Sequence, residues 1–132
     1  MSPMPAQLYG VGVDLLRIER MDRAWQRHGQ RLCERILHPR EAERFAAARR
    51  PGNYLAKCFA VKEATVKALG TGFRGVYHRD VGWVPDARGK PLLVFSPRLR
   101  ALMDEWGVAG GELSLSDEAG MVIAFVVLER SA

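Results

Sequence analysis

The longest uninterrupted helical pattern in the chain runs from Tyr54 to Leu69, a segment that contains neither proline nor glycine. Asn53 precedes it as a suitable N-cap, and Gly70 follows where a glycine commonly ends a helix. Alanine recurs every four residues within the segment, at positions 56, 60, 64 and 68. Because such a row of small side chains lets another backbone approach closely, we predict that this helix is the centre of the fold.

The segment Leu8–Asp14 has the two-residue period of a strand. One face carries Tyr9, Val11 and Val13, and the other carries Gly10, Gly12 and Asp14. Glycine inside a strand often marks the close approach of another backbone. We therefore predict that the glycine face packs on the alanine row, which would bring Asp14 toward Glu63.

The remaining pattern predicts short helices and strands around the central helix. We expect helices at 15–28, 30–37, 39–48 and 97–106, and strands at 81–84, 92–95, 113–115 and 121–128. This order predicts an α+β fold in which residues 1–132 form a single domain, with a long helix packed on a small, mostly antiparallel sheet. The strand Met121–Leu128 is so apolar that either both of its faces are covered or it lies at a subunit contact.

The positive charge is concentrated in one part of the chain. The net charge is +5, and residues 17–50 hold ten arginines against five acidic residues, so the rest is balanced. On the helix at 15–28, Arg20, Arg23 and Arg27 lie away from the apolar side. A localised basic surface of this kind indicates an acidic protein, nucleic acid or anionic lipid as partner, or simply a solvated face.

The chain shows no sign of a membrane or secreted protein. Its longest apolar run has eight residues, too few to span a bilayer, and the N-terminus has neither a charged start nor an apolar core of a secretory signal. Cys33 and Cys58 lack the spacing of metal ligands or of a disulfide framework. We expect a cytoplasmic protein that does not bind membranes.

Polar residues on the central helix suggest a site. Glu63 and Lys67 are one turn apart, which is also the spacing of an ordinary surface ion pair. Lys62 lies next to them, and Gly70-Thr71-Gly72 follows with backbone N–H groups that we expect to be free. A carboxylate, two ammonium groups and a glycine-rich turn together suit a phosphate ester bound with a divalent metal.

Two motifs carry a family resemblance. Phe59-Ala-Val-Lys-Glu-Ala64 with Lys67-Ala-Leu-Gly-Thr-Gly72, and Gly10-Val-Gly-Val-Asp14 near the N-terminus, resemble the signatures of the holo-[acyl-carrier-protein] synthases. These are small 4′-phosphopantetheinyl transferases of bacterial fatty-acid synthesis. The resemblance covers nearly the whole chain, from Tyr9 to Glu129, and implies the 4′-phosphopantetheinyl transferase fold.

The resemblance implies a transfer of 4′-phosphopantetheine from coenzyme A to a serine of an apo acyl carrier protein, with release of adenosine 3′,5′-bisphosphate. It implies Mg²⁺ held by Asp14 and Glu63, with Glu63 accepting the serine proton and Lys67 steadying the leaving group. The residues implied in coenzyme binding are Lys62, Lys67, Gly70, Thr71, Gly72 and Lys90.

The same resemblance implies the partners. Arg20 and Arg27 match the positions that dock the acidic helix of the carrier protein. Members of the family are typically homotrimers with active sites between neighbouring subunits, which makes Met121–Leu128 a candidate subunit contact.

Three positions depart from the family pattern. Arg17 and Cys58 stand where glutamate and arginine are common, and Asp117 replaces a frequent histidine. None of these changes removes Asp14, Glu63 or Lys67, so we expect the protein to be an active transferase. We do not expect it to bind nucleic acid. The alternatives are an inactive paralogue that binds coenzyme A, and a basic module that binds nucleic acid through its arginine helix.

Overall fold

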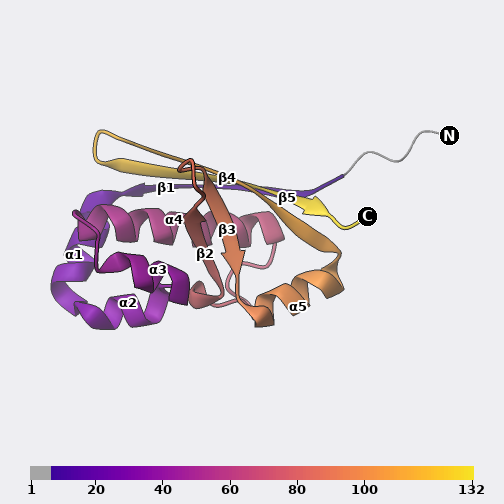
Figure 1. The fold of residues 1–132 in the computed structure, drawn as a ribbon, viewed down its shortest axis with the longest axis horizontal. Coiled ribbons are helices and arrows are strands. Elements are labelled where there is room, and N and C mark those ends of the chain that lie inside the picture. The colour runs from indigo at the N-terminus through magenta and orange to yellow at the C-terminus, as the bar shows by residue number, and fades with distance from the viewer. Residues whose placement is uncertain (1–6) are drawn as a thin grey trace.

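The computed structural model describes residues 7–132 (Figure 1). Residues 1–6, which hold most of the N-terminus interpreted above as lacking a secretory signal, lie outside the described residues. The helices are α1 (Ile18–His28), α2 (Gln30–Ile36), α3 (Pro39–Phe45), α4 (Pro51–Leu69), the 3₁₀ helix η1 (His78–Asp80) and α5 (Pro97–Trp106). The strands are β1 (Leu8–Arg17), β2 (Val81–Pro85), β3 (Pro91–Phe95), β4 (Val108–Glu118) and β5 (Met121–Arg130).

Helix α4 lies in the middle of the molecule. A three-stranded antiparallel sheet in the order β1-β5-β4 covers one side of it (Figure 1). Helix α1 and the separate β2–β3 hairpin pack against other sides of α4, with α2 and α3 beyond them. Because α4 is covered from several directions, its buried residues are spread around the helix rather than along one stripe. The predicted α+β fold with a central helix on an antiparallel sheet is confirmed.

Strand β1 approaches α4 as closely as the backbone allows. A Cβ atom placed on Gly12 would lie 1.9 Å from the carbonyl oxygen of Ala64, and one on Gly10 would lie 2.0 Å from that of Ala68. Any side chain at either position would therefore collide with the backbone of α4. The prediction that the glycine face packs on the alanine row is confirmed.

Several element boundaries differ from the prediction. Helix α4 begins at Pro51, with Arg50 rather than Asn53 before its first turn, because proline at the first helical position already has a suitable φ. Strand β1 continues to Arg17, so α1 begins at Ile18. Strand β4 starts at Val108, well before the predicted residue 113.

Tyr9 does not share a face with Val11 and Val13 as predicted. An irregularity in the β1–β5 pairing between Leu8 and Gly10 shifts the alternation at this position. The Tyr9 hydroxyl group instead donates to the carbonyl oxygen of Leu69 at the end of α4, at 3.5 Å.

Strand β5 is covered on one face only in the single chain. Its side chains that face α4 are buried, namely Val122, Ala124, Val126 and Leu128. The opposite face of the sheet exposes apolar side chains of β1 and β5, namely Val11, Val13, Leu15, Ile123 and Phe125. We call these five residues the outer apolar face. Val13 and Phe125 are paired across the two strands, so the exposed patch is continuous.

Candidate active site

Asp14, Glu63 and Lys67 come together where β1 runs beside α4. The ammonium group of Lys67 donates to the carbonyl oxygen of Val13 at 2.9 Å and lies 3.4 Å from Oδ1 of Asp14. Glu63 lies one turn before Lys67 on the same edge of the helix. The close contact between Gly12 and Ala64 sets the distance between the two elements, so the glycines of β1 bring Asp14 to the helix.

Both carboxyl groups are partly withdrawn from water. Burial raises the pKa of Asp14, against the charges of Lys67 and Arg20, which lower it. Burial also raises the pKa of Glu63; the Asp14 charge raises it further, and Lys67 and Arg20 again lower it. The site therefore holds two neighbouring carboxylates that bind protons more readily than usual, beside two cations.

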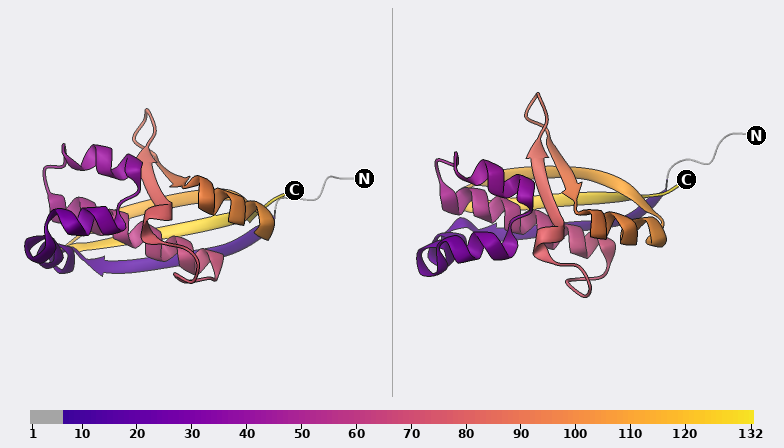
Figure 2. Two further views of the ribbon diagram at one scale, coloured as in Figure 1. Left: turned by 90° about the horizontal axis from the view of Figure 1, so that it is seen from below. Right: turned by 60° about the horizontal axis from the view of Figure 1, so that its bottom comes forward.

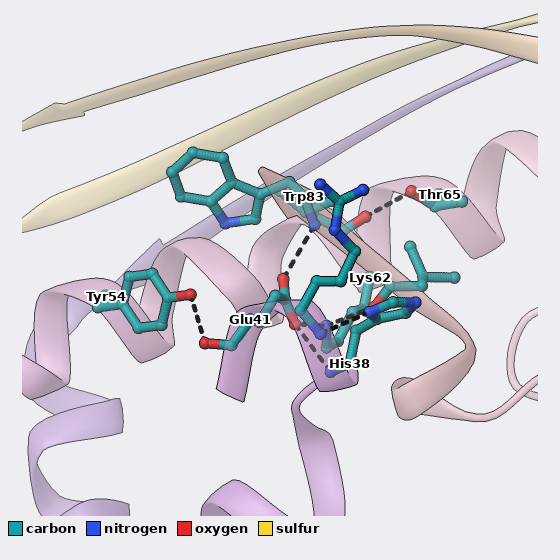
Figure 3. Close-up of polar contacts among 9 residues, drawn as sticks. His38, Glu41, Tyr54, Lys62, Thr65 and Trp83 are labelled. Atoms are coloured by element: carbon teal, nitrogen blue, oxygen red, sulfur yellow. Dashed lines mark hydrogen bonds and ion pairs between the residues drawn. The ribbon is translucent and has the colours of Figure 1, made fainter. Parts of the chain in front are cut away.

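Lys62 does not belong to this site. Its side chain is fully buried, and its ammonium group pairs with the carboxylate of Glu41 and donates to the carbonyl oxygen of Val81 at 2.5 Å (Figure 3). At 100° per residue, Lys62 lies about 160° around the helix from Ala64, on the side away from β1. The prediction that Lys62 holds the coenzyme's phosphates is therefore wrong in this structure, because Glu41 and the β2–β3 hairpin enclose it.

The Glu41–Lys62 pair joins three elements of the core. Glu41 of α3 also accepts hydrogen bonds from the backbone N–H groups of His38 and Trp83, both at 3.1 Å (Figure 3). His38 is the N-cap of α3, and its Nδ1 accepts a hydrogen bond from the backbone N–H group of Arg40. The pair thus attaches α3 and β2 to the side of α4 that faces away from β1.

The turn after α4 uses its N–H groups internally. The N–H groups of Gly70, Thr71 and Gly72 all donate to the carbonyl oxygen of Val66, at 3.0 to 3.3 Å. The Thr71 hydroxyl group donates to the carbonyl oxygen of Gly72 at 2.7 Å. The expectation that these N–H groups are free for a phosphate is wrong, because they complete the hydrogen bonding at the helix end.

Comparison with known proteins identifies the family of this arrangement. The family model described as the 4′-phosphopantetheinyl transferase superfamily matches residues 10–113. A holo-[acyl-carrier-protein] synthase of Thiobacillus denitrificans is 48% identical over 126 residues, which cover 95% of this chain and 96% of the relative. The chain belongs to the holo-[acyl-carrier-protein] synthases of this superfamily.

Solved structures of holo-[acyl-carrier-protein] synthases share the fold. The crystal structure from Neisseria meningitidis is similar with a TM-score of 0.90 and 45% identity, and the match covers 94% of this chain and 100% of that one. The structure from Bacillus anthracis, in complex with CoA (3′,5′-ADP), matches with a TM-score of 0.77 and 31% identity over 94% of this chain and 98% of that one. The family assignment thus rests on both sequence and fold.

The two carboxylates fit a hard divalent cation. Each is partly buried, and the charge of Asp14 disfavours ionisation of Glu63, a conflict that a bound cation would relieve. Within residues 7–132, no group of three or more His, Cys, Asp or Glu side chains is placed to hold a metal ion. A site with two protein carboxylates suits Mg²⁺, which commonly takes its other ligands from substrate phosphates and water.

Lys90 lies on another side of the molecule from this cluster. It follows the turn of the β2–β3 hairpin, where Oδ1 of Asp86 accepts from the N–H groups of Arg88 and Lys90. Its ammonium group is 3.0 Å from Oε2 of Glu112 on β4. Figure 2 shows the hairpin tip and the turn after α4 projecting in opposite directions in both views.

A basic cavity was missed by the sequence analysis. It has a volume of about 270 Å³, and its lining includes Arg44, Arg49, Arg50, Lys57 and Trp83. The indole N–H of Trp83 and Nη1 of Arg44 are buried there without a hydrogen-bond partner among the described residues. The excess of arginine in residues 17–50 was the only signal of this cavity in the sequence, because its members come from three separate elements.

The arginine face of α1 adjoins the carboxylate cluster. Arg20 and Arg27 are exposed and line a shallow groove of about 310 Å³. The guanidinium group of Arg20 lies 5.7 Å from the ring centre of Phe59, one turn before Glu63, and its charge lowers the pKa of both Asp14 and Glu63. Arg23 is engaged in an ion pair with Glu19.

Proposed function

We propose that this chain transfers the 4′-phosphopantetheine group from coenzyme A to a serine hydroxyl group of an apo acyl carrier protein, with release of adenosine 3′,5′-bisphosphate. The observation that carries the proposal is the meeting of Asp14, Glu63 and Lys67 at the contact of β1 and α4. Membership of the holo-[acyl-carrier-protein] synthases, and the coenzyme bound to the Bacillus anthracis relative, support the substrates.

Each residue of the cluster has a separate task in this reaction. The serine oxygen attacks the phosphorus atom that carries the pantetheine, the bond from that phosphorus to the nucleotide's phosphate breaks, and the serine proton passes to Glu63. Because burial raises the pKa of Glu63, it is a better proton acceptor than an exposed glutamate. Lys67 has three N–H donors; two face Val13 and Asp14, and the third is available to the departing phosphate.

Magnesium is part of the proposal, with Asp14 and Glu63 as its protein ligands. When bound, the ion neutralises negative charge on the diphosphate during transfer. Without a cation, the two carboxylates repel the diphosphate and leave Lys67 and Arg20 as the nearest opposing charges. We propose that Gly70, Thr71 and Gly72 line the coenzyme site with the exposed side of their turn. Their N–H groups do not contact the coenzyme, because they are hydrogen-bonded to the carbonyl oxygen of Val66.

The remaining coenzyme contacts lie at the other edge of the main sheet. We call Asp14, Glu63 and Lys67 the catalytic half. It lies at the β1 edge of the sheet, because Asp14 belongs to β1. Lys57 and Lys90 pair with Asp117 and Glu112, both on β4. We call Lys57, Lys90 and the basic cavity the nucleotide half. Because β1 and β4 are opposite edges of the sheet, one chain presents the two halves in different directions.

We propose that the two halves meet between subunits of the homotrimer that the family resemblance implies. The outer apolar face gives the surface for this assembly, because five large apolar side chains at 40% to 62% exposure are unusual for a surface that stays in water. In this arrangement the catalytic half of one chain and the nucleotide half of a neighbour hold one coenzyme A molecule.

The carrier protein is proposed to dock on α1 through Arg20 and Arg27. Arg20 is close enough to influence both carboxylates, so a carrier bound there would have its serine near Glu63. We also propose a cytoplasmic location, because both thiols, Cys33 and Cys58, are buried and unpaired, as suits a reducing compartment. No helix within residues 7–132 is long and apolar enough to cross a membrane.

The test is to mix the protein with apo carrier protein, coenzyme A and Mg²⁺ and to measure the carrier by mass spectrometry. We expect the mass increment of one phosphopantetheine group, and none for a carrier whose acceptor serine is replaced by alanine. Coenzyme binding without transfer would indicate the inactive paralogue. Retention of duplex DNA at physiological salt, without any use of carrier, would indicate the nucleic-acid module instead.

A further inference from the structure

Three rings form a continuous stack beside the catalytic half. The ring of His78, from η1, lies parallel to that of Phe73, with centres 3.9 Å apart and planes inclined by 14°. On α4, Phe59 lies 5.6 Å from His78 with an inclination of 22°. All three residues are partly buried. Phe59 is one helical turn before Glu63, and Phe73 directly follows the turn of residues 70–72.

The segment that contains Phe73 begins directly after the hydrogen-bonded turn of residues 70–72, whose N–H groups are held by the carbonyl oxygen of Val66. Gly70, Gly72 and Gly75 adopt φ angles of 79°, 58° and 76°, which glycine reaches without strain and leaves just as easily. The far end of the segment is held by Arg98, whose Nη2 donates to the carbonyl oxygen of Gly75 at 2.6 Å. Between Gly72 and Gly75, the ring of Phe73 on His78 is the contact that fixes the chain.

We propose that His78 is a positioning residue for coenzyme binding: its ring holds Phe73 and thereby fixes residues 73–75, the continuation of the turn after α4, relative to Glu63 and Lys67. This inference rests on the proposed function for its link to coenzyme A, but not for its effect on residues 73–75. His78 acts here through the face of its ring and takes no part in proton transfer.

The surroundings of His78 favour a neutral ring. Burial lowers the pKa of its imidazole, and the nearby charges of Lys62 on α4 and Arg35 on α2 lower it further. A neutral imidazole stacks on phenyl rings much as another aromatic ring does. A phenylalanine should therefore perform the same task, whereas it could not replace a histidine that moves a proton.

Three variants test this role. His78→Ala removes the ring, His78→Phe restores a ring without nitrogen atoms, and Arg79→Ala removes an exposed side chain from the same 3₁₀ helix as a matched control. We expect His78→Ala to raise the KM for coenzyme A about tenfold, because binding must then order residues 73–75, while kcat changes less than about threefold. His78→Phe and Arg79→Ala should both remain within about twofold of the original protein.

Amide hydrogen exchange of residues 70–76 supplies a readout that does not depend on activity. We expect faster exchange in His78→Ala and unchanged exchange in His78→Phe, even if the protein transfers nothing. If His78→Phe is as impaired as His78→Ala, or if His78→Ala changes neither exchange nor KM, the positioning role is refuted. Should His78→Ala fail to fold, Phe73→Leu, which removes the opposite ring of the stack, replaces it with the same expected results.

Discussion

Lys62 and Glu63 are consecutive in the sequence but serve different sides of α4, about 100° apart around the helix axis. Lys62 is fully buried against Glu41 and the β2–β3 hairpin, whereas Glu63 stands beside Asp14 at the contact with β1. One residue attaches the helix to the core, and the next presents a carboxylate to the substrate. Their substitutions should therefore affect different properties.

The first prediction concerns stability. Lys62→Met leaves the carboxylate of Glu41 buried without its partner, so we expect the free energy of unfolding to fall by about 3 to 5 kcal/mol in urea titrations. Adding Glu41→Gln should recover part of this loss, because the unpaired charge is then removed. The KM for coenzyme A should stay unchanged in whichever variant folds. A large increase in KM would show that Lys62 contributes to coenzyme binding.

The second prediction concerns the carboxylates of Asp14 and Glu63. Glu63→Gln or Asp14→Asn should lower transfer at least about 100-fold, because the proton acceptor or a metal ligand is lost. If either variant keeps an activity close to that of the original protein, the proposed catalytic role of Asp14, Glu63 and Lys67 is refuted. Far-ultraviolet circular dichroism should show the same fold in both variants.

The same two variants should be more stable than the original protein in metal-free buffer at neutral pH. Burial raises the pKa of both carboxyls in the folded state, so the folded protein binds the proton more tightly than the unfolded chain. Ionisation at neutral pH therefore costs stability, and this cost disappears as the pH falls below the unfolded values of about 4. Calorimetry should show a higher Tm for Glu63→Gln at pH 7 and a difference that shrinks toward pH 4.

The third prediction concerns the contact between β1 and α4. Gly12→Ala places a methyl group on the carbonyl oxygen of Ala64, so we expect a loss of about 3 kcal/mol or more in unfolding free energy. Because the obstacle is a backbone atom, adding Ala64→Gly should not restore stability. Restoration by that second change would mean that side chains, not backbones, meet at this contact.

The fourth prediction concerns the arginines of α1. Arg27→Glu should weaken use of the carrier roughly fivefold or more and flatten its salt dependence, with the KM for coenzyme A unchanged. Arg20→Glu should in addition move the pH profile of transfer upward, because Arg20 lowers the pKa of both Asp14 and Glu63. Arg40→Glu, the same charge change on α3, serves as the control. Normal use of carrier by Arg27→Glu would show that α1 is not the docking surface.

The fifth prediction concerns assembly. Phe125→Asp puts a charge in the outer apolar face opposite Val13, and Val127→Asp places one in the same strand. We expect both to give monomers or insoluble protein by light scattering, whereas Ala101→Asp on the exposed side of α5 should not. An original protein that is monomeric and active at assay concentration would refute the shared site.

The sequence predicted best what depends on local spacing. The glycines of β1 and the alanines of α4 were enough to place Asp14 near Glu63, because only a close backbone contact requires both patterns. The strand predicted at 113–115, by contrast, left out Gly110 and Gly111, although β4 passes through them beside β5. A Cβ atom on Gly111 would lie 2.0 Å from the carbonyl oxygen of Val127, a neighbour that no local pattern reveals.

The errors in the site have the same origin. Lys62 has its partner Glu41 twenty-one residues away, in another helix, so its burial could not be read from the spacing of Lys62, Glu63 and Lys67. The turn of residues 70–72 was expected to offer free N–H groups, but the end of α4 needs them for its own carbonyl oxygens. In both cases a polar group was assigned to substrate although the fold itself uses it.

Glu63 lies near Asp14 on one edge strand of the sheet and Lys90 pairs with Glu112 on the other, so under the proposed shared site two differently damaged copies can repair each other. In a shared-site assembly, a Glu63→Ala chain still offers an intact nucleotide half, and a Lys90→Glu chain still offers an intact catalytic half. Mixed trimers would therefore contain some complete sites although neither parent protein has any. In a cell that expresses both defective genes, this complementation would restore carrier activation.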